Sequence, residues 1–113
     1  MDKLERYQTA IKRVLTQYHD WVASAYQEPD ESLLIFDDTH NQYIWMQVGW
    51  TGKRRNNGIQ VHARIKNGKI WIEEDWTETG IATELVNLGI SPKEIVLAFH
   101  HPDERSLTDF AAA

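Results

Sequence analysis

The residues of this 113-residue chain that are best suited to chemistry are carboxylates at the end of a predicted strand. Glu73, Glu74 and Asp75 are consecutive, Glu78 follows, and His62 would lie beside them if its own strand pairs with theirs. Carboxylates with a histidine can bind a divalent metal ion, as in a metal-dependent nuclease. The lysine that such a nuclease needs is badly spaced, and exposed acids are common. We therefore expect a solvated rim, with no metal and no cofactor.

A second group that could do chemistry is the basic run Lys53, Arg54 and Arg55, the densest positive charge in a chain of net charge −5. Such a run could contact phosphates or an acidic partner surface. The acidic remainder of the chain repels nucleic acid at long range. A solvated hairpin tip is the interpretation that we favour, and weak DNA binding through these residues is the alternative.

Other catalytic patterns are missing from the sequence. The chain has no cysteine, no G-x-S-x-G nucleophile motif and no phosphate-binding loop, so we predict no catalytic residue. The longest apolar run, 95–99, is too short to cross a bilayer, and the charged N-terminus does not resemble an export signal. We expect a cytoplasmic protein that does not contact a membrane.

The elements that must position these residues begin with a helix over about residues 2–25. Apolar residues recur there at three- and four-residue steps, and Asp2 with Glu5 forms a capping-box pattern. The segment Glu28-Pro29-Asp30 is predicted to stop the helix. Strand-like alternation follows in four segments: 33–36, 43–50, 59–65 and 70–72.

Asn67-Gly68 predicts a two-residue type I′ turn, and that turn fixes a register. Lys66 should pair with Lys69, which sets the next pairs as Ile65 with Ile70, Arg64 with Trp71, Ala63 with Ile72 and His62 with Glu73. A cation–π contact between Arg64 and Trp71 and a hydrogen bond between His62 and Glu73 are then expected. The buried face should carry the aliphatic residues Ile59, Val61, Ala63, Ile65, Ile70 and Ile72.

Helical spacing returns after Trp76, with Thr77 or Thr79 as the cap, Gly89 as the stop, and a short helix or turn over 92–97. Helix, strands and then helices predict one α+β domain over residues 1–113. It consists of an N-terminal helix, an antiparallel sheet of about four strands, and one or two short C-terminal helices packed on one sheet face.

Too few helices are predicted to cover both faces of this sheet. Alternation along 43–50 places Tyr43 and Trp45 on the open face and directs Trp50 to the core. With Arg64 and Trp71 they would form an exposed aromatic surface for binding a protein partner. That surface would serve either a homodimer, in which two open faces meet, or a different protein.

Several segments resemble one known family in order and spacing. These are Val48-Gly-Trp-Thr-Gly-Lys-Arg-Arg55, Lys69-Ile-Trp-Ile-Glu-Glu-Asp75, Thr77-Glu-Thr-Gly-Ile-Ala82 and Pro92-Lys-Glu-Ile-Val-Leu-Ala-Phe-His-His-Pro102. Together they resemble XisI, the fdxN element excision controlling factor of cyanobacteria, over nearly the whole chain.

The resemblance implies a role in a DNA rearrangement that accompanies heterocyst formation. In that family a separate recombinase exchanges the strands, and XisI acts with a companion, XisH, that resembles nucleases. The resemblance supplies no catalytic residues. We therefore expect a non-catalytic accessory protein of programmed element excision that contacts an XisH-like partner, with DNA binding and a nuclease subunit as the alternatives.

Overall fold

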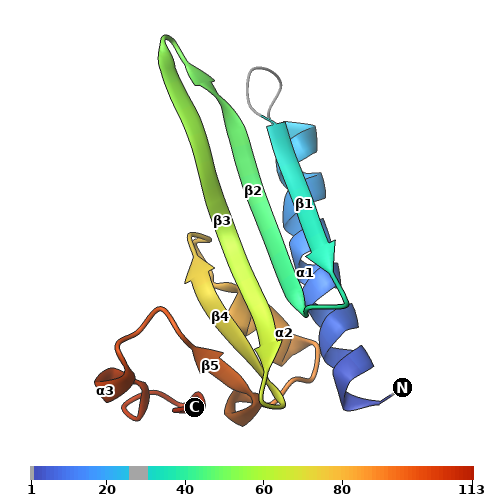
Figure 1. Ribbon diagram of the computed structural model, residues 1–113, viewed down its shortest axis with the longest axis vertical. Coiled ribbons are helices and arrows are strands. Elements are labelled where there is room, and N and C mark those ends of the chain that lie inside the picture. Colours follow the sequence, from blue (N-terminus) through green and yellow to red (C-terminus); the bar gives the residue numbers. More distant parts are fainter. Residues whose placement is uncertain (1, 26–30) are drawn as a thin grey trace.

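The computed structural model describes residues 2–25 and 31–113, arranged as one helix, a twisted sheet and a short C-terminal helical part (Figure 1). In chain order the elements are α1 (Lys3–Ala25), β1 (Glu31–Asp37), β2 (Gln42–Thr51), β3 (Arg54–Lys66), β4 (Lys69–Asp75), α2 (Ile81–Asn87), the 3₁₀ turn η1 (Pro92–Glu94), β5 (Ile95–Leu97) and α3 (Pro102–Arg105). This order confirms the predicted α+β class.

The long helix α1 begins where the sequence predicts. The Asp2 carboxylate accepts a hydrogen bond from the Glu5 backbone N–H at 2.8 Å, which satisfies one of the free donors of the first turn. The apolar stripe of α1 faces the sheet, and Ile11 and Leu15 on it are completely buried. The predicted stop at 28–30 lies outside the described residues.

The five strands form one sheet in the order β1-β2-β3-β4-β5. The β3–β4 turn has the left-handed backbone that its sequence requires, with φ of 52° at Asn67 and 73° at Gly68. The predicted register is confirmed for the first four pairs, from Lys66 with Lys69 to Ala63 with Ile72. A bulge then shifts the register, so His62 pairs with Glu74 and not with Glu73.

The fifth strand was not predicted, because residues 95–97 were expected in a short helix or turn. In the structure β5 pairs with β4 in parallel, and Ile95 and Val96 are completely buried. Parallel pairing needs a crossover, and α2 supplies it between β4 and β5. The predicted helix start at Ser91-Pro92 survives only as η1, with a capping box between Ser91 and Glu94.

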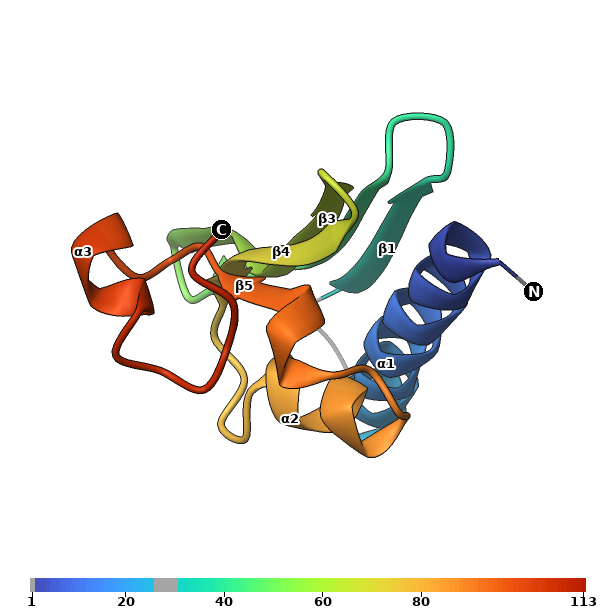
Figure 2. The ribbon, with the colours of Figure 1, turned by 90° about the horizontal axis from the view of Figure 1, so that it is seen from below.

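Helices α1 and α2 lie on the same side of the sheet, and the main core fills the space between them and the strands (Figure 2). This arrangement confirms a C-terminal helix packed on one sheet face. On the other face, the described residues form a buried cluster near β4 and β5, where Ala111 packs with Trp71 and Val96. The described residues contain no helix with the length and apolar character needed to span a membrane.

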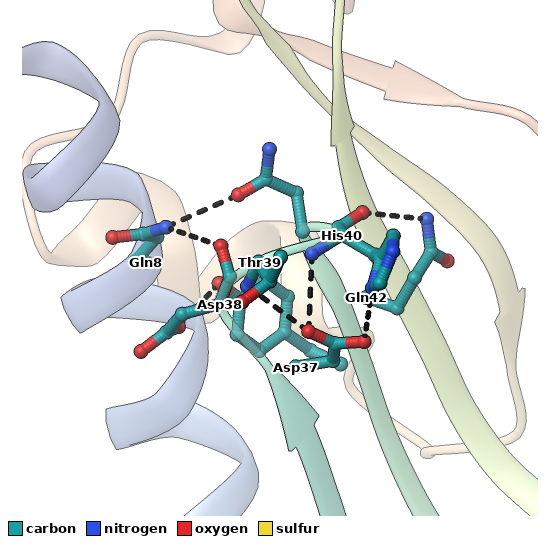
Figure 3. Close-up of polar contacts among 8 residues, drawn as sticks. Gln8, Asp37, Asp38, Thr39, His40 and Gln42 are labelled. Carbon is teal, nitrogen blue, oxygen red and sulfur yellow. Dashed lines mark hydrogen bonds and ion pairs between the residues drawn. The ribbon is translucent and has the colours of Figure 1, made fainter.

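The β1–β2 turn is fastened by a network of polar contacts beside α1 (Figure 3). The Asp37 carboxylate accepts the His40 backbone N–H at 3.0 Å and lies 2.7 Å from His40 Nδ1. Asp38 accepts the Tyr43 hydroxyl at 2.6 Å, and Gln8 of α1 donates to the Asp38 carbonyl at 3.4 Å. This network holds the start of β2 against the helix.

Candidate functional site

The predicted exposed aromatic surface is wrong for β2, because Tyr43 and Trp45 face α1. Tyr43 is completely buried and Trp45 is only 5% exposed, whereas Trp50, predicted to point inward, is 49% exposed. The pairing of β2 with β3 explains why the two faces of β2 are the reverse of those predicted. Tyr43 pairs with Ala63 and Trp45 with Val61, and β3 turns these two small residues toward the helices.

The face without helices is therefore aliphatic along β1, β2 and the adjoining part of β3. Cross-strand pairs place Ile35 beside Ile44 and Leu33 beside Met46 on this face. A bulge between β2 and β3 pairs Met46 with Ile59, so Ile59 also leaves the buried face that the sequence predicted for it.

Trp71 lies on the face predicted for it, but it is not open to solvent. The C-terminal segment packs over it, and Trp71 is 9% exposed. The cations over its ring are Lys66 at 4.6 Å and Arg105 at 5.7 Å, in place of the predicted Arg64. Arg64 instead pairs with Glu73, with Nε 2.9 Å from the carboxylate. The predicted surface of Tyr43, Trp45, Arg64 and Trp71 is therefore not assembled.

A different aromatic site is present between α1 and the loop that leads from β4 to α2. We call it the aromatic pocket. It has a volume of about 450 Å³, within the size range of ligand pockets, and mostly apolar walls. Its lining comprises Gln17, Tyr18, Trp21, Val22, Trp45, Gln60, Trp76, Thr77, Glu78, Thr79 and Glu84.

Two stacked rings belong to the less exposed part of the aromatic pocket. The rings of Tyr18 and Trp45 are 5.7 Å apart with 21° between their planes. The indole N–H of Trp45 donates to Ser32 Oγ at 2.7 Å, and His19 Nδ1 lies 2.7 Å from the same hydroxyl. These contacts fix Trp45, so this part of the pocket is preformed.

Two tryptophans of the lining remain largely exposed. Trp21 of α1 is 64% exposed and Trp76 of the β4–α2 loop is 72% exposed. The backbone N–H of Trp76 donates to the carbonyl of Gln60, the extra residue of the bulge in β3, at 2.8 Å. Its indole N–H donates to Glu74 at 2.6 Å. Trp76 is therefore held by two anchors although its ring is exposed.

Asp75 shapes the loop that carries Trp76. Its carboxylate accepts the backbone N–H groups of Thr77 at 2.9 Å and Ile81 at 2.8 Å. The prediction that Thr77 or Thr79 caps α2 is wrong, since the cap position is Gly80 with φ of 89° and Asp75 receives the first helical N–H. Asp75 therefore stabilises the conformation of this loop.

The acidic residues considered for a metal site have separate partners. Glu73 pairs with Arg64, Glu74 holds Trp76 and Asp75 caps the loop. Within residues 2–25 and 31–113, no three histidine or acidic side chains come together where they could hold a metal ion. The expected bond between His62 and Glu73 is replaced by a contact of His62 Nε2 with Gln42 at 2.9 Å. Burial lowers the pKa of His62.

The basic run occupies the tip of the β2–β3 hairpin, which projects beyond the other strands (Figure 1). Lys53, Arg54 and Arg55 are all exposed. The guanidinium of Arg55 lies 5.1 Å from the centre of the Trp50 ring. The expectation of a solvated hairpin tip agrees with this placement.

Fold and site together define a small α+β domain with one helical layer, a mixed five-stranded sheet and an open aromatic pocket. The chain belongs to the XisI family: residues 1–112 match the family described as XisI protein. No curated protein matches the chain.

Two solved structures from Anabaena variabilis ATCC 29413 are similar over almost the whole chain. One is a XisI-like protein with 37% identity and a TM-score of 0.90, covering 97% of this chain and 99% of its own. The other is the fdxN element excision controlling factor XisI, with 41% identity and a TM-score of 0.86, covering 99% of this chain and 100% of its own. The name of the second protein fits a regulatory role in element excision.

Trp21 and Trp76 were not among the site residues predicted from the sequence. Trp21 had a usable signal, because it is a large aromatic residue beside the apolar stripe of α1, next to Val22. Trp76 offered none, since its position depends on a bulge in β3 that joins it to Gln60.

Proposed function

We propose that this chain is a non-catalytic accessory protein of programmed DNA element excision, and that it acts by contacting an XisH-like partner at the aromatic pocket. The observation that carries the proposal is the pair of exposed tryptophans, Trp21 and Trp76, in the lining of a preformed pocket. Tryptophan is enriched among the residues that dominate binding energy in protein interfaces. Exposed aromatic area next to a pocket is typical of an interaction site.

The distribution of the acidic side chains supports a non-catalytic role. Glu73, Glu74 and Asp75 each make a contact that holds the fold or the pocket loop. The family resemblance supports the choice of partner, because an XisH-like companion accompanies XisI. The name of the 41% identical relative, an excision controlling factor, supports the process.

The test is the dissociation constant between the purified chain and an XisH-like protein. A Trp21→Ala/Trp76→Ala double variant should bind at least about 30-fold more weakly, since the loss of even one interface hot spot costs about 2 kcal/mol or more. Trp50→Ala is the matched control, because it removes an exposed tryptophan far from the pocket. Equal weakening in both variants, or none in the double variant, would contradict the proposal.

Contact with nucleic acid through the hairpin tip is the second candidate. The observation in its favour is the exposed aromatic ring of Trp50, stacked beneath Arg55 and next to two further cations. A ring for base stacking beside cations for phosphates is the combination used for single strands. The net charge of −5 opposes such binding, so we expect it to be weak.

A further inference from the structure

Among the residues that the structure describes, the charged side chains that line the aromatic pocket are all acidic. They are Glu78 and Glu84, and none of the described lining residues is lysine, arginine or histidine. Glu84 is half-buried on α2 and Glu78 is exposed on the loop. An aromatic wall with carboxylates and no cation attracts a positively charged group.

Carboxylates also act on Tyr18, one of the two stacked rings in the pocket. Burial raises the pKa of the Tyr18 hydroxyl, a hydrogen bond with Thr77 acts against this, and the negative charges of Glu84 and Asp75 add to the rise. Glu84 therefore acts on the Tyr18 hydroxyl, in agreement with the place of both residues in the pocket lining.

Two tryptophans outside the pocket have cations over their rings. Lys66 and Arg105 lie over Trp71, and Arg55 lies over Trp50. Among the residues that the structure describes, no cation lies over Trp21 or Trp76, the two most exposed tryptophans. Their faces are available in surroundings that favour a cation.

We infer that the aromatic pocket receives an arginine side chain from the protein partner, stacked on Trp21 or Trp76 and paired with Glu84. This inference rests on the proposed function, because it names the chemistry of the partner at that same site. A guanidinium fits better than an ammonium, since it is planar, stacks on indole rings and pairs with a carboxylate through two N–H groups. A wholly apolar side chain would leave the Glu84 charge without a partner as it is desolvated.

A short peptide probe tests this chemistry without the partner. Acetyl-Gly-Arg-Gly-amide is titrated into the ¹⁵N-labelled chain in the millimolar range, and the indole N–H signals are followed. We expect the Trp21 and Trp76 signals to move while that of Trp50 stays still. The matching peptide with citrulline, a neutral analogue of arginine, should produce no shift at the same concentration.

Variants test separately the stacking on a tryptophan and the ion pair with Glu84. Removal of the stacked ring, tested with Trp21→Ala and with Trp76→Ala, should weaken binding of the arginine peptide about 2- to 5-fold in at least one of the two variants, and Glu84→Gln should weaken it by a similar factor. Trp50→Ala is the control and should bind like the unchanged chain. Equal binding of the arginine and citrulline peptides, or an undiminished affinity in Glu84→Gln, would overturn the inference.

Binding of the XisH-like partner separates this inference from the proposed function. If partner binding depends on Trp21 and Trp76 but is unaffected by Glu84→Gln, the proposed function stands and the arginine inference is wrong. If the partner does not bind at all, the proposed function is wrong, and the peptide result alone decides the chemistry of the pocket.

A second copy of the chain is the competing occupant, since its hairpin tip carries exposed arginines. Analytical ultracentrifugation over a range of concentrations covers this case. Self-association that is lost both in Trp76→Ala and in an Arg54→Ala/Arg55→Ala variant would assign the pocket to a second copy and overturn the assignment to a different partner.

Discussion

Replacing Trp45 should destabilise the fold far more than replacing Trp50, although alternation along the strand predicts the opposite. Trp45 is 5% exposed, stacks on Tyr18 at 5.7 Å and donates its indole N–H to Ser32 at 2.7 Å. Trp50 is 49% exposed at the projecting hairpin, with Arg55 over its ring. The two residues lie on the same strand, so strand propensity does not account for a difference between them.

The size of the effect follows from burial. A buried tryptophan replaced by alanine costs about 3–5 kcal/mol, a large fraction of the roughly 5–15 kcal/mol that stabilises a domain. A Trp50→Ala change loses about 0.5–1 kcal/mol, the value of an exposed cation–π contact. A loss of about 1 kcal/mol lowers Tm by about 4 °C in a chain of this length. The expected fall in Tm is therefore about 12–20 °C for Trp45→Ala and at most about 4 °C for Trp50→Ala.

Thermal and urea unfolding followed by circular dichroism measure both values, because tryptophan fluorescence would change with the substitution itself. Trp45→Phe is the milder variant to use if Trp45→Ala does not fold. It loses the hydrogen bond to Ser32 and part of the stacked ring, so about 1–2 kcal/mol is expected. If Trp50→Ala proves more costly than Trp45→Ala, our assignment of the two faces of β2 is wrong.

Three further predictions follow from local geometry. The hydrogen bond from Tyr43, with the nearby Lys12, lowers the pKa of Asp38 below 3.8, so the stability that Asp38 adds is present above pH 3.8 and is lost as the pH falls through the folded-state pKa. The gap in unfolding free energy between the unchanged chain and Asp38→Asn should therefore close under acid titration, and a constant gap would contradict it. Gly80→Ala, at φ of 89°, should cost about 1–3 kcal/mol in urea unfolding, whereas Gly58→Ala, in open space, should change little. Any binding of single-stranded DNA should fall with salt at a log–log slope of about −2 and vanish when residues 53–55 become Glu; mobility shifts that persist in that variant would exclude the hairpin tip.

Much of the fold is readable from local signals. The three- and four-residue spacing of apolar residues gave α1, and the cap at Asp2 gave its start. Asn67-Gly68 gave both the β3–β4 turn and its register over four pairs. Each signal lies within a few residues of the structure that it specifies. The order and spacing of four sequence segments were sufficient to identify the family.

Local signals were insufficient where both faces of a strand are apolar. Along β2, Ile44 and Met46 alternate with Tyr43 and Trp45, so the pattern does not tell which set meets a helix. The choice follows from pairing with β3, where small side chains such as Ala63 leave room for large rings beneath α1.

The sequence by itself determined the helix, the central turn, the class of fold and the family. Only the tertiary structure decided which aromatic residues are exposed. The C-terminal segment covers Trp71, a bulge at Gln60 places Trp76, and α1 brings Trp21 to the same pocket. Each of these contacts joins residues far apart in the chain, and a period of two or of 3.6 residues carries no information about such contacts.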